Sequence, residues 1–323
     1  QGASWGVPIL DHAISLTEQP IRNTVVECYD FIIKQLKQAI PLLSSEKNNG
    51  QINAYAAQAL LARVYLYREQ NKEAFETAQD LITELEKNRQ YYLAPRNNYA
   101  AQFALNNKFG SESLFEIAFS ASDNPGRDGL AYSMHLWGYA DIVATKDFVD
   151  LMAEDPDDIR CQLLDQVYNG QEIEQNIRYW LMKYPGTSYG VPSVENNYMV
   201  FRLSEVYLIA AEAGLKAGGE YRSPALSYLN DIVSRANPDK SVSDAEFTLD
   251  RVLKERRKEL VGEGHRYFDA LRNNQTIIRK GGWHLDGIPE EINWDYTKCI
   301  LPIPKEQFQM NPDMQQNPGY SRE

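Results

Sequence analysis

The stretch RLSEVYLIAAEA, residues 202–213, decides the fold of this 323-residue chain. Its apolar residues recur every three or four positions, which is the spacing of one helix face. Its alanines allow a neighbouring helix to approach closely. The letters RVYL at 63–66 echo EVYL at 205–208, in a segment equally rich in alanine. The two stretches therefore predict two similar helical hairpins within one chain.

The helices around these stretches follow the plan of tetratricopeptide repeats, in which hairpins of two helices stack side by side. The first hairpin is predicted over 53–68 and 72–88. The second is predicted over 198–216 and from Pro224 onward, with Ser223 as its N-cap. We therefore predict a mainly α fold of tetratricopeptide-like helical hairpins, with long irregular loops and a few short strands.

Two capping boxes mark further helix starts. Thr24 with Glu27 predicts the start of one helix, because each side chain can satisfy an unpaired backbone N–H of the first turn. Pro41 is predicted to end that helix. Ser243 with Glu246 predicts the start of a second, highly charged helix.

The segments between and after the hairpins lack a helical period. Alternating residues over 113–120 predict a short strand, and 178–184 is a second strand candidate whose Trp180 and Tyr184 are expected in the core. Residues 123–140 are rich in glycine and aromatic residues, and 281–320 contains several prolines, so both are predicted to be irregular. Long loops that are structured are usually functional.

Composition excludes several classes of function. The net charge is -12, which disfavours nucleic acid as a partner, and no apolar run approaches the ~20 residues of a bilayer span. Three widely spaced cysteines make neither a disulfide framework nor a zinc motif. No nucleotide-binding or hydrolase motif occurs, so we expect no catalytic residues, no cofactor and no metal. The acidic run at 154–158 predicts a solvated turn.

Motifs along the C-terminal part of the chain resemble, in order, those of the SusD/RagB family. Residues 202–213 are similar to its helix R-L-x-E-x-Y-L-x-x-A-E-A. The other matching segments are Leu229-Asn230-x-Ile232 with Arg235-Ala236, Glu255-Arg256-Arg257-Lys258-Glu259-Leu260, Glu263-Gly264-His265-Arg266, Phe268-Asp269, Leu301-Pro302-Ile303-Pro304 and Gln316-Asn317-Pro318-Gly319-Tyr320.

The resemblance implies one SusD-like unit over 1–323. Within it we expect the first helical hairpins at 24–90, a loop-rich ligand-binding excursion at 110–197, and the signature helices and C-terminal tail at 198–323. Family members carry a lipid-modified cysteine and further helices before the position that matches residues 5–8. We expect that such an N-terminal part is missing from this chain.

The resemblance also implies a role. Such proteins are lipoproteins at the outer-membrane surface of Gram-negative bacteria, where they capture nutrients, most often oligosaccharides. They act as the lid of a TonB-dependent transporter of the SusC type and are not catalytic. The implied partners are therefore an oligosaccharide and that transporter, and the membrane is met only through an anchor that this chain does not contain.

The charged signature residues are expected to be structural. Arginine pairs well with carboxylates through its planar fork. Arg256, Arg257 and Glu259 are therefore predicted to tie helix to helix, with Glu205 or Glu212 among the partners. Arg266 is predicted to act in the same way.

Ligand-binding residues are expected in the loops. An aromatic ring can stack on the C–H face of a sugar while polar neighbours bind its hydroxyls. The first candidate group is Tyr132, His135, Trp137, Tyr139 and Asp141. The second group is Trp283, Trp294 and Tyr296, which can instead meet the transporter or pack under the tail.

Three other functions remain open at this stage. A peptide-binding member of the same family would use a long groove with polar groups that read a backbone. A tetratricopeptide-type interaction scaffold would leave a concave helical face open and bury its loop aromatics. A hydrolase would need two carboxylates facing one cleft, roughly 5–10 Å apart.

Overall fold

The computed structural model describes residues 5–15, 17–135, 137–166, 179–186, 193–279 and 287–322. Its α-helices are α1 (Val25–Ala39), α2 (Ala54–Tyr67), α3 (Asn71–Lys87), α4 (Leu130–Met134), α5 (Lys146–Ala153), α6 (Leu203–Ala217), α7 (Arg222–Ala236), α8 (Leu249–Glu259), α9 (Arg266–Arg272) and α10 (Lys305–Met310). Its strands are β1 (Ser113–Ile117), β2 (Leu164–Gln166), β3 (Tyr179–Leu181), β4 (Tyr198–Arg202), β5 (Ile277–Ile278) and β6 (Glu291–Ile292). In these ranges, no helix has both the length and the apolar character that a bilayer crossing demands.

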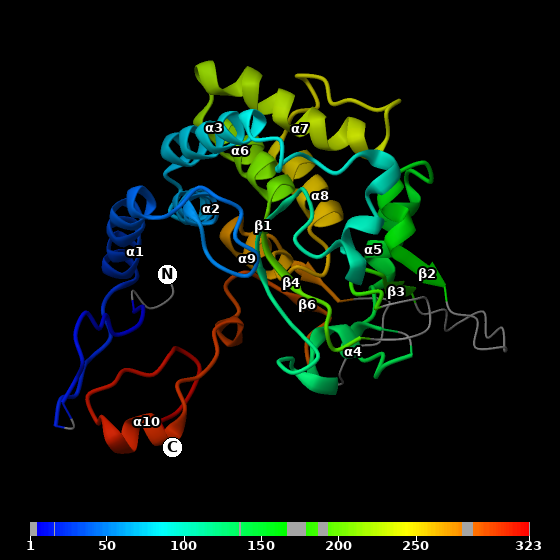
Figure 1. Ribbon diagram of the computed structural model, residues 1–323. Coiled ribbons are helices and arrows are strands. Elements are labelled where there is room, and N and C mark those ends of the chain that lie inside the picture. The colour runs from blue at the N-terminus through cyan, green and yellow to red at the C-terminus, as the bar shows by residue number, and fades with distance from the viewer. Residues whose placement is uncertain are drawn as a thin grey trace.

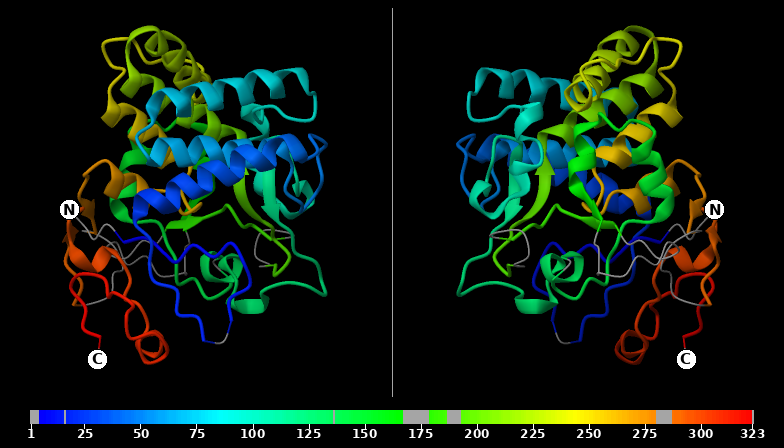
Figure 2. Two further views of the ribbon diagram at one scale, coloured as in Figure 1. Left: turned by 90° about the vertical axis from the view of Figure 1, so that its left-hand side faces the viewer. Right: turned by 90° about the vertical axis from the view of Figure 1, so that its right-hand side faces the viewer.

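The two predicted hairpins form the centre of the molecule. Helices α2 and α3 stack on α6 and α7, and α8 packs against α6 (Figure 1). The views from both sides show these helices as one layered body, with irregular segments below it (Figure 2). Small residues let the helices lie close together. At Gly214, an added Cβ would lie only 2.5 Å from the Cβ of Ala225 and 2.7 Å from the ring of Phe75. The mainly α fold is confirmed.

Helix starts follow the sequence in part. The capping box of Thr24 and Glu27 is present at α1. The prediction for Ser223 is wrong, because α7 already begins at Arg222. The Ser243–Glu246 pair does form, with 2.6 Å between the serine hydroxyl and the carboxylate, but it closes a turn. The cap of α8 is Thr248.

The predicted helix over 198–216 is wrong in its first five residues. Residues 198–202 are strand β4, which pairs antiparallel with β1, Phe201 opposite Phe115. Aromatic and β-branched residues favour a strand when a partner is present, and β1 supplies that partner from far away in sequence. The strand predicted at 113–120 is confirmed as β1.

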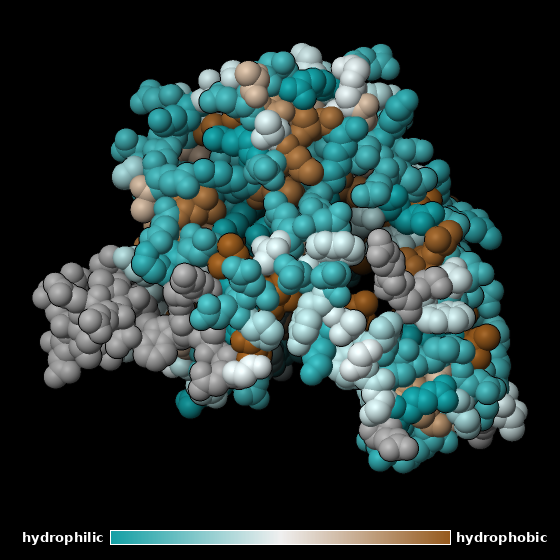
Figure 3. All heavy atoms as spheres, turned by 180° about the vertical axis from the view of Figure 1, so that it is seen from behind, coloured by the Kyte–Doolittle hydropathy of each residue, from teal (hydrophilic) through white to brown (hydrophobic). Residues whose placement is uncertain are grey.

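The irregular segments contain two helices that the sequence did not predict. Helix α4 lies inside the 123–140 excursion, and α10 lies in the C-terminal run. The run packs against the start of the chain: the Asn311 side chain donates to the Pro20 carbonyl at 2.8 Å, and Arg22 donates to the Gln315 carbonyl at 3.0 Å. Seen from behind, this lobe projects at the lower right, separated by a notch from the rest (Figure 3).

The signature charges form a buried lattice, as predicted. The Glu259 carboxylate is 0% exposed and accepts from Arg202 at 2.7 Å and from Arg235 at 2.6 Å. The lattice joins the end of α8 to β4 and to α7. A buried carboxylate is tolerable only when such partners satisfy it. The lattice therefore fixes the relative position of the second hairpin and the strand that leads into it.

A second cluster fastens α9 to α6. Arg256 lies 3.6 Å from Glu212 and 2.9 Å from Asp269. The pKa of Asp269 is far below its usual range: burial alone would raise it, but Arg256 and Arg272 outweigh that effect. The prediction that Arg257 ties helix to helix is confirmed, because it pairs with Asp147 of α5 at 2.5 Å. The prediction for Arg266 is wrong, because its guanidinium donates to the neutral amide of Gln275 at 2.8 Å.

Candidate ligand-binding site

The loop that follows α4 folds back onto the helix. The Tyr139 N–H donates to the Tyr132 carbonyl at 2.8 Å, and the Ile142 N–H donates to the Ser133 carbonyl at 3.0 Å. Gly138 makes this possible, because a Cβ there would lie 2.2 Å from the Tyr132 carbonyl oxygen. These bonds hold residues 138, 139 and 142 against the short helix α4.

This loop presents the first group of predicted residues. The Trp137 side chain is 62% exposed and Tyr139 is 51% exposed. Tyr132 is half-buried, with its ring centroid 6.2 Å from that of Tyr139, and Asp141 is exposed. Two tyrosines and one tryptophan thus stand together at a solvent-facing surface.

His135 has a different position from its neighbours. It is 5% exposed, and its Nδ1 accepts from the Trp137 N–H at 3.1 Å. Burial lowers its pKa. The ring is therefore neutral at pH 7 and supports the loop from inside, while Trp137 projects outward.

The second predicted group lies in the C-terminal part of the chain. Trp283 falls outside the described residues. Trp294 is exposed and follows β6, whereas Tyr296 is half-buried. Near them, the Tyr267 hydroxyl donates to the Cys299 carbonyl. Of this predicted group, Trp294 is the exposed ring among the described residues, and no ring contact to it is found there.

An aromatic hollow opens beside α4. We use this name for the cavity of about 490 Å³ lined by Arg63, Tyr67, Leu130, Met134, Tyr184, Tyr198, Met199, Val200, Gly262, Glu263, Gly264, His265 and Phe268. The rings of Tyr184 and Tyr198 meet edge to face at 5.6 Å. The exposed Phe268 ring lies 6.3 Å from Tyr67.

The aromatic hollow is fastened to α4 by Tyr198. Its hydroxyl accepts from the Leu130 N–H at 2.7 Å. Leu130 and Met134 of α4 line the hollow, and the loop with Trp137 follows directly after them. The exposed rings and the hollow therefore share one supporting element.

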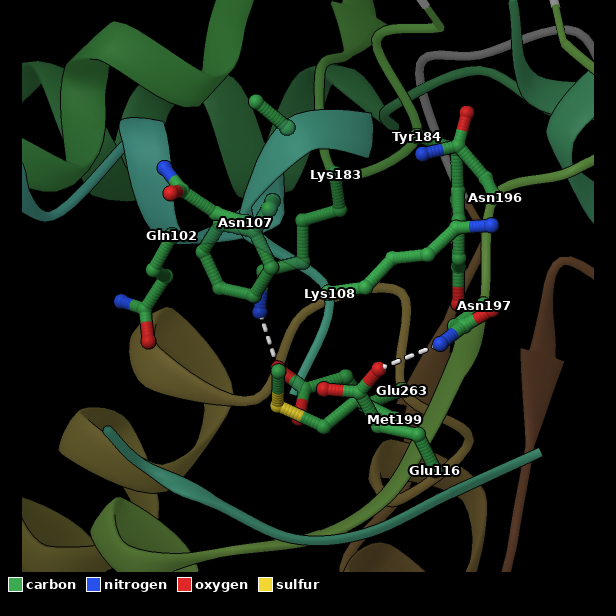
Figure 4. A pocket seen from close by; sticks show the side chains of 12 residues that line it. Gln102, Asn107, Lys108, Glu116, Lys183, Tyr184, Asn196, Asn197, Met199 and Glu263 are labelled. Carbon is green, nitrogen blue, oxygen red and sulfur yellow. Dashed lines mark hydrogen bonds and ion pairs between the residues drawn. The ribbon is translucent and has the colours of Figure 1, made fainter. Parts of the chain in front are cut away.

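A polar hollow lies on the other side of Tyr184. It is lined by Gln102, Phe103, Ala104, Asn107, Lys108, Glu116, Lys183, Tyr184, Asn196, Asn197, Met199 and Glu263 (Figure 4). The Asn197 amide donates to Glu116 at 2.8 Å. Tyr184, Met199 and Glu263 line both hollows. Sequence reasoning missed these residues, and the paired polar residues Asn107-Lys108 and Asn196-Asn197 were the available signal.

Glu263, which lines both hollows, pairs with Lys183 of the polar hollow, and both side chains are buried. Burial lowers the pKa of Lys183 to about 8, although Glu263 opposes this effect. Burial would raise the pKa of Glu263, but Arg202 and Lys183 lower it to about 2. Glu263 is thus an anion at neutral pH, and it pairs with Arg202 of the buried lattice at 2.7 Å. It offers acceptor oxygens in a fixed position.

No group of three or more metal-ligating side chains gathers within the described ranges. The prediction of a solvated turn at 154–158 is wrong for one of its residues. Asp158 is buried and accepts from Arg160 at 2.8 Å, while Glu154 remains exposed. Trp180 and Tyr184 are buried, which confirms their predicted place in the core.

Comparisons with known proteins agree with the fold. Residues 164–320 match the family model described as "SusD family", and 4–66 match the model "Starch-binding associating with outer membrane". A SusD superfamily protein of known structure from Bacteroides vulgatus is 51% identical with a TM-score of 0.94, over 99% of this chain and 71% of that one. A putative sugar binding protein from the same organism is 38% identical with a TM-score of 0.87, over 99% and 71%.

Among curated proteins, the SusD-like protein P38 of Formosa agariphila is 22% identical over 98% of this chain and 70% of its own length. A SusD-like protein of Bacteroides ovatus is 25% identical over 83% of this chain and 55% of its own length. The chain thus spans between about half and about two thirds of these relatives.

Proposed function

The chain belongs to the SusD family, and from this premise we propose that it binds an oligosaccharide at the cell surface and delivers it, without catalysis, to a TonB-dependent transporter of the SusC type. One family model that it matches is described as associating with the outer membrane, and the protein is placed there. The 38% identical relative is named as a putative sugar binding protein. These comparisons support the ligand class.

The observation that carries the proposal is the exposed pair Trp137 and Tyr139 on the α4 loop. Large rings are normally buried at least in part, and an exposed pair on an ordered loop is suited to contact a ligand. The face of a pyranose ring is apolar and its edge is hydroxylated, so stacking on a ring leaves its hydroxyls to polar groups. The amides and carboxylate of the polar hollow are groups of that kind.

The two hollows have separate parts in this proposal. The aromatic hollow receives the apolar face of a sugar unit against Tyr198 and Phe268. The polar hollow has a volume of about 30 Å³, which admits a hydroxyl group but not a sugar ring, so Asn197 and Glu116, which bond to each other, are offered to a hydroxyl that reaches in. Positioned polar groups give a pocket its specificity.

The test uses the double variant Trp137→Ala with Tyr139→Ala. Calorimetry with α-linked and β-linked gluco-oligosaccharides should show binding to the parent protein and at least a tenfold loss in the variant. Both side chains are exposed, so the melting temperature should stay within about 1–2 °C. Trp5→Ala is the matched control, because Trp5 is also an exposed ring, at 36%, and lines neither this site nor either hollow.

Three results would count against the proposal. Unchanged affinity in the double variant would remove the α4 loop as the site. Binding of peptides with no sugar binding would favour the peptide-binding function. New reducing ends after incubation with an oligosaccharide would show catalysis and refute a purely binding role.

A further inference from the structure

A second groove lies on the helical side of the molecule, away from the α4 loop. It has a volume of about 640 Å³, which is in the usual range for small-molecule sites. Helix α3 and the segment after it contribute Glu86, Arg89 and Tyr92, α6 contributes Tyr207, and α7 contributes Asp231. Helix α6 packs against both α3 and α7, so the three helices form one continuous support.

Tyr207 is the unusual residue of this groove. Its side chain is 8% exposed, and its ring meets Tyr228 edge to face at 5.6 Å. Its hydroxyl makes no hydrogen bond to any residue in the described part of the chain. The ring is buried, but the hydroxyl itself reaches the solvent of the groove. Here the hydroxyl is available to a group that enters the groove.

The space around this hydroxyl is negative. Glu86 and Asp231 are both exposed, and neither forms an ion pair with another described residue. Burial raises the pKa of Tyr207, and the charges of Asp231 and Glu86 raise it further. Although Asp231 has solvent access, the protein around it removes part of its hydration and raises its pKa, and Glu86 adds to this effect.

The cations at the groove do not neutralise this region. Arg235 already forms ion pairs with Glu112 at 2.5 Å and with Glu259 at 2.6 Å. Arg89 lines the groove at its exposed edge and forms no ion pair with Glu86 or Asp231. A ligand that brings its own positive charge is therefore favoured.

We propose that this groove binds a ligand carrying a primary ammonium group. An ammonium has three N–H donors, and the groove offers three acceptors in the carboxylates of Asp231 and Glu86 and the hydroxyl oxygen of Tyr207. The body of the ligand lies against the exposed ring of Tyr92. The site is independent of the α4 loop, so the two proposals stand or fall separately.

An ammonium of this kind can come from an amino sugar or from a lysine side chain. Calorimetry at low salt with glucosamine, N-acetylglucosamine and Nα-acetyl-lysine amide separates the sources. We expect heat from the amines and none from the neutral N-acetyl sugar. Tighter binding of glucosamine identifies an amino sugar as the source, and tighter binding of the lysine derivative identifies a protein side chain.

Two variants test the named acceptors. Asp231→Asn should weaken amine binding by about tenfold or more, because it removes a charge-assisted hydrogen bond. Tyr207→Phe removes only the hydroxyl and should weaken binding several-fold. Tyr228→Phe is the matched control, because it alters the neighbouring ring without touching the groove, and Trp137→Ala should leave amine binding unchanged.

The proposal is overturned by any of three results. These are equal heats for glucosamine and its N-acetyl form, an unchanged affinity in Asp231→Asn, and no heat from either amine at millimolar concentration. A loss of oligosaccharide binding in Trp137→Ala with intact amine binding would leave both proposals in place.

Discussion

Replacing Glu259 by glutamine should destabilise the protein more than any other single change in a carboxylate pair. Its carboxylate is 0% exposed and contacts the guanidinium groups of Arg202 and Arg235, with Arg160 at 3.6 Å. Removing one partner of a buried ion pair costs about 3–5 kcal/mol, because the remaining charges stay buried without compensation. A glutamine keeps the shape but leaves the three arginines without that anion.

The size of the effect on the melting temperature follows from the chain length. At about 2.1 cal/mol/K per residue, 323 residues give an unfolding entropy of about 0.7 kcal/mol/K. A loss of 3–5 kcal/mol therefore lowers the melting temperature by about 4–7 °C. Circular dichroism at 222 nm on heating at pH 7 measures it. Adding Arg202→Gln to the variant should cost less than the sum of the two single changes, because the two residues are in contact.

The control is Asp150→Asn. Asp150 pairs with Lys146 on one face of α5, and both side chains are more than 60% exposed. Such pairs contribute less than about 0.5 kcal/mol, so the melting temperature should change by less than about 1 °C. If Glu259→Gln melts within about 1 °C of Asp150→Asn, the lattice does not hold the fold and the reasoning fails.

Three further changes test other parts of the fold. Gly214→Ala places a Cβ 2.7 Å from the Phe75 ring and should cost about 1–3 kcal/mol, measured by denaturant titration; a neutral result would mean that the helices can separate freely. Thr248→Ala removes the cap of α8 and should cost about 1 kcal/mol in the same titration, with a cost below 0.3 kcal/mol contradicting the assigned cap. Acid should also destabilise the protein. Burial would raise the pKa of Glu212, but its arginine and lysine partners outweigh burial and lower this pKa from 4.5 to about 2. The stabilising effect of the Glu212 carboxylate is therefore complete above pH 4.5 and is lost as the pH falls toward 2. Melting temperatures from pH 6 to pH 2.5 should show that decline in the parent and a flatter curve in Glu212→Gln.

Sequence reasoning predicted the helices well where the signals are local. The capping box at Thr24 and the alanine-rich faces of α2 and α6 depend only on neighbouring residues. Strand β4 was missed because its partner β1 lies far away in the chain, and its residues alone also suit a helix start. Ser243 with Glu246 completes a capping-box motif, but the same motif can close a turn, and the cap of α8 is Thr248.

The candidate site was predictable only in its loop. Glycine and aromatic residues without a period indicated a functional excursion, and Trp137 and Tyr139 are exposed there. The same pattern could not reveal that His135 is buried, since that depends on the fold of the loop. The polar hollow combines Asn107, Asn197 and Glu263 from three distant segments, so no linear motif describes it.

The lobe built from the two ends of the chain has a consequence for biosynthesis. Arg22 donates to the carbonyl of Gln315, which is 293 residues further along. At about 5–20 residues per second, translation separates the emergence of these two residues from the ribosome by roughly 15–60 s. During that interval the segment before α1 has none of its C-terminal contacts, even when the hairpins have already packed. The segment before α1 is therefore among the last parts of the described chain to be fixed in place.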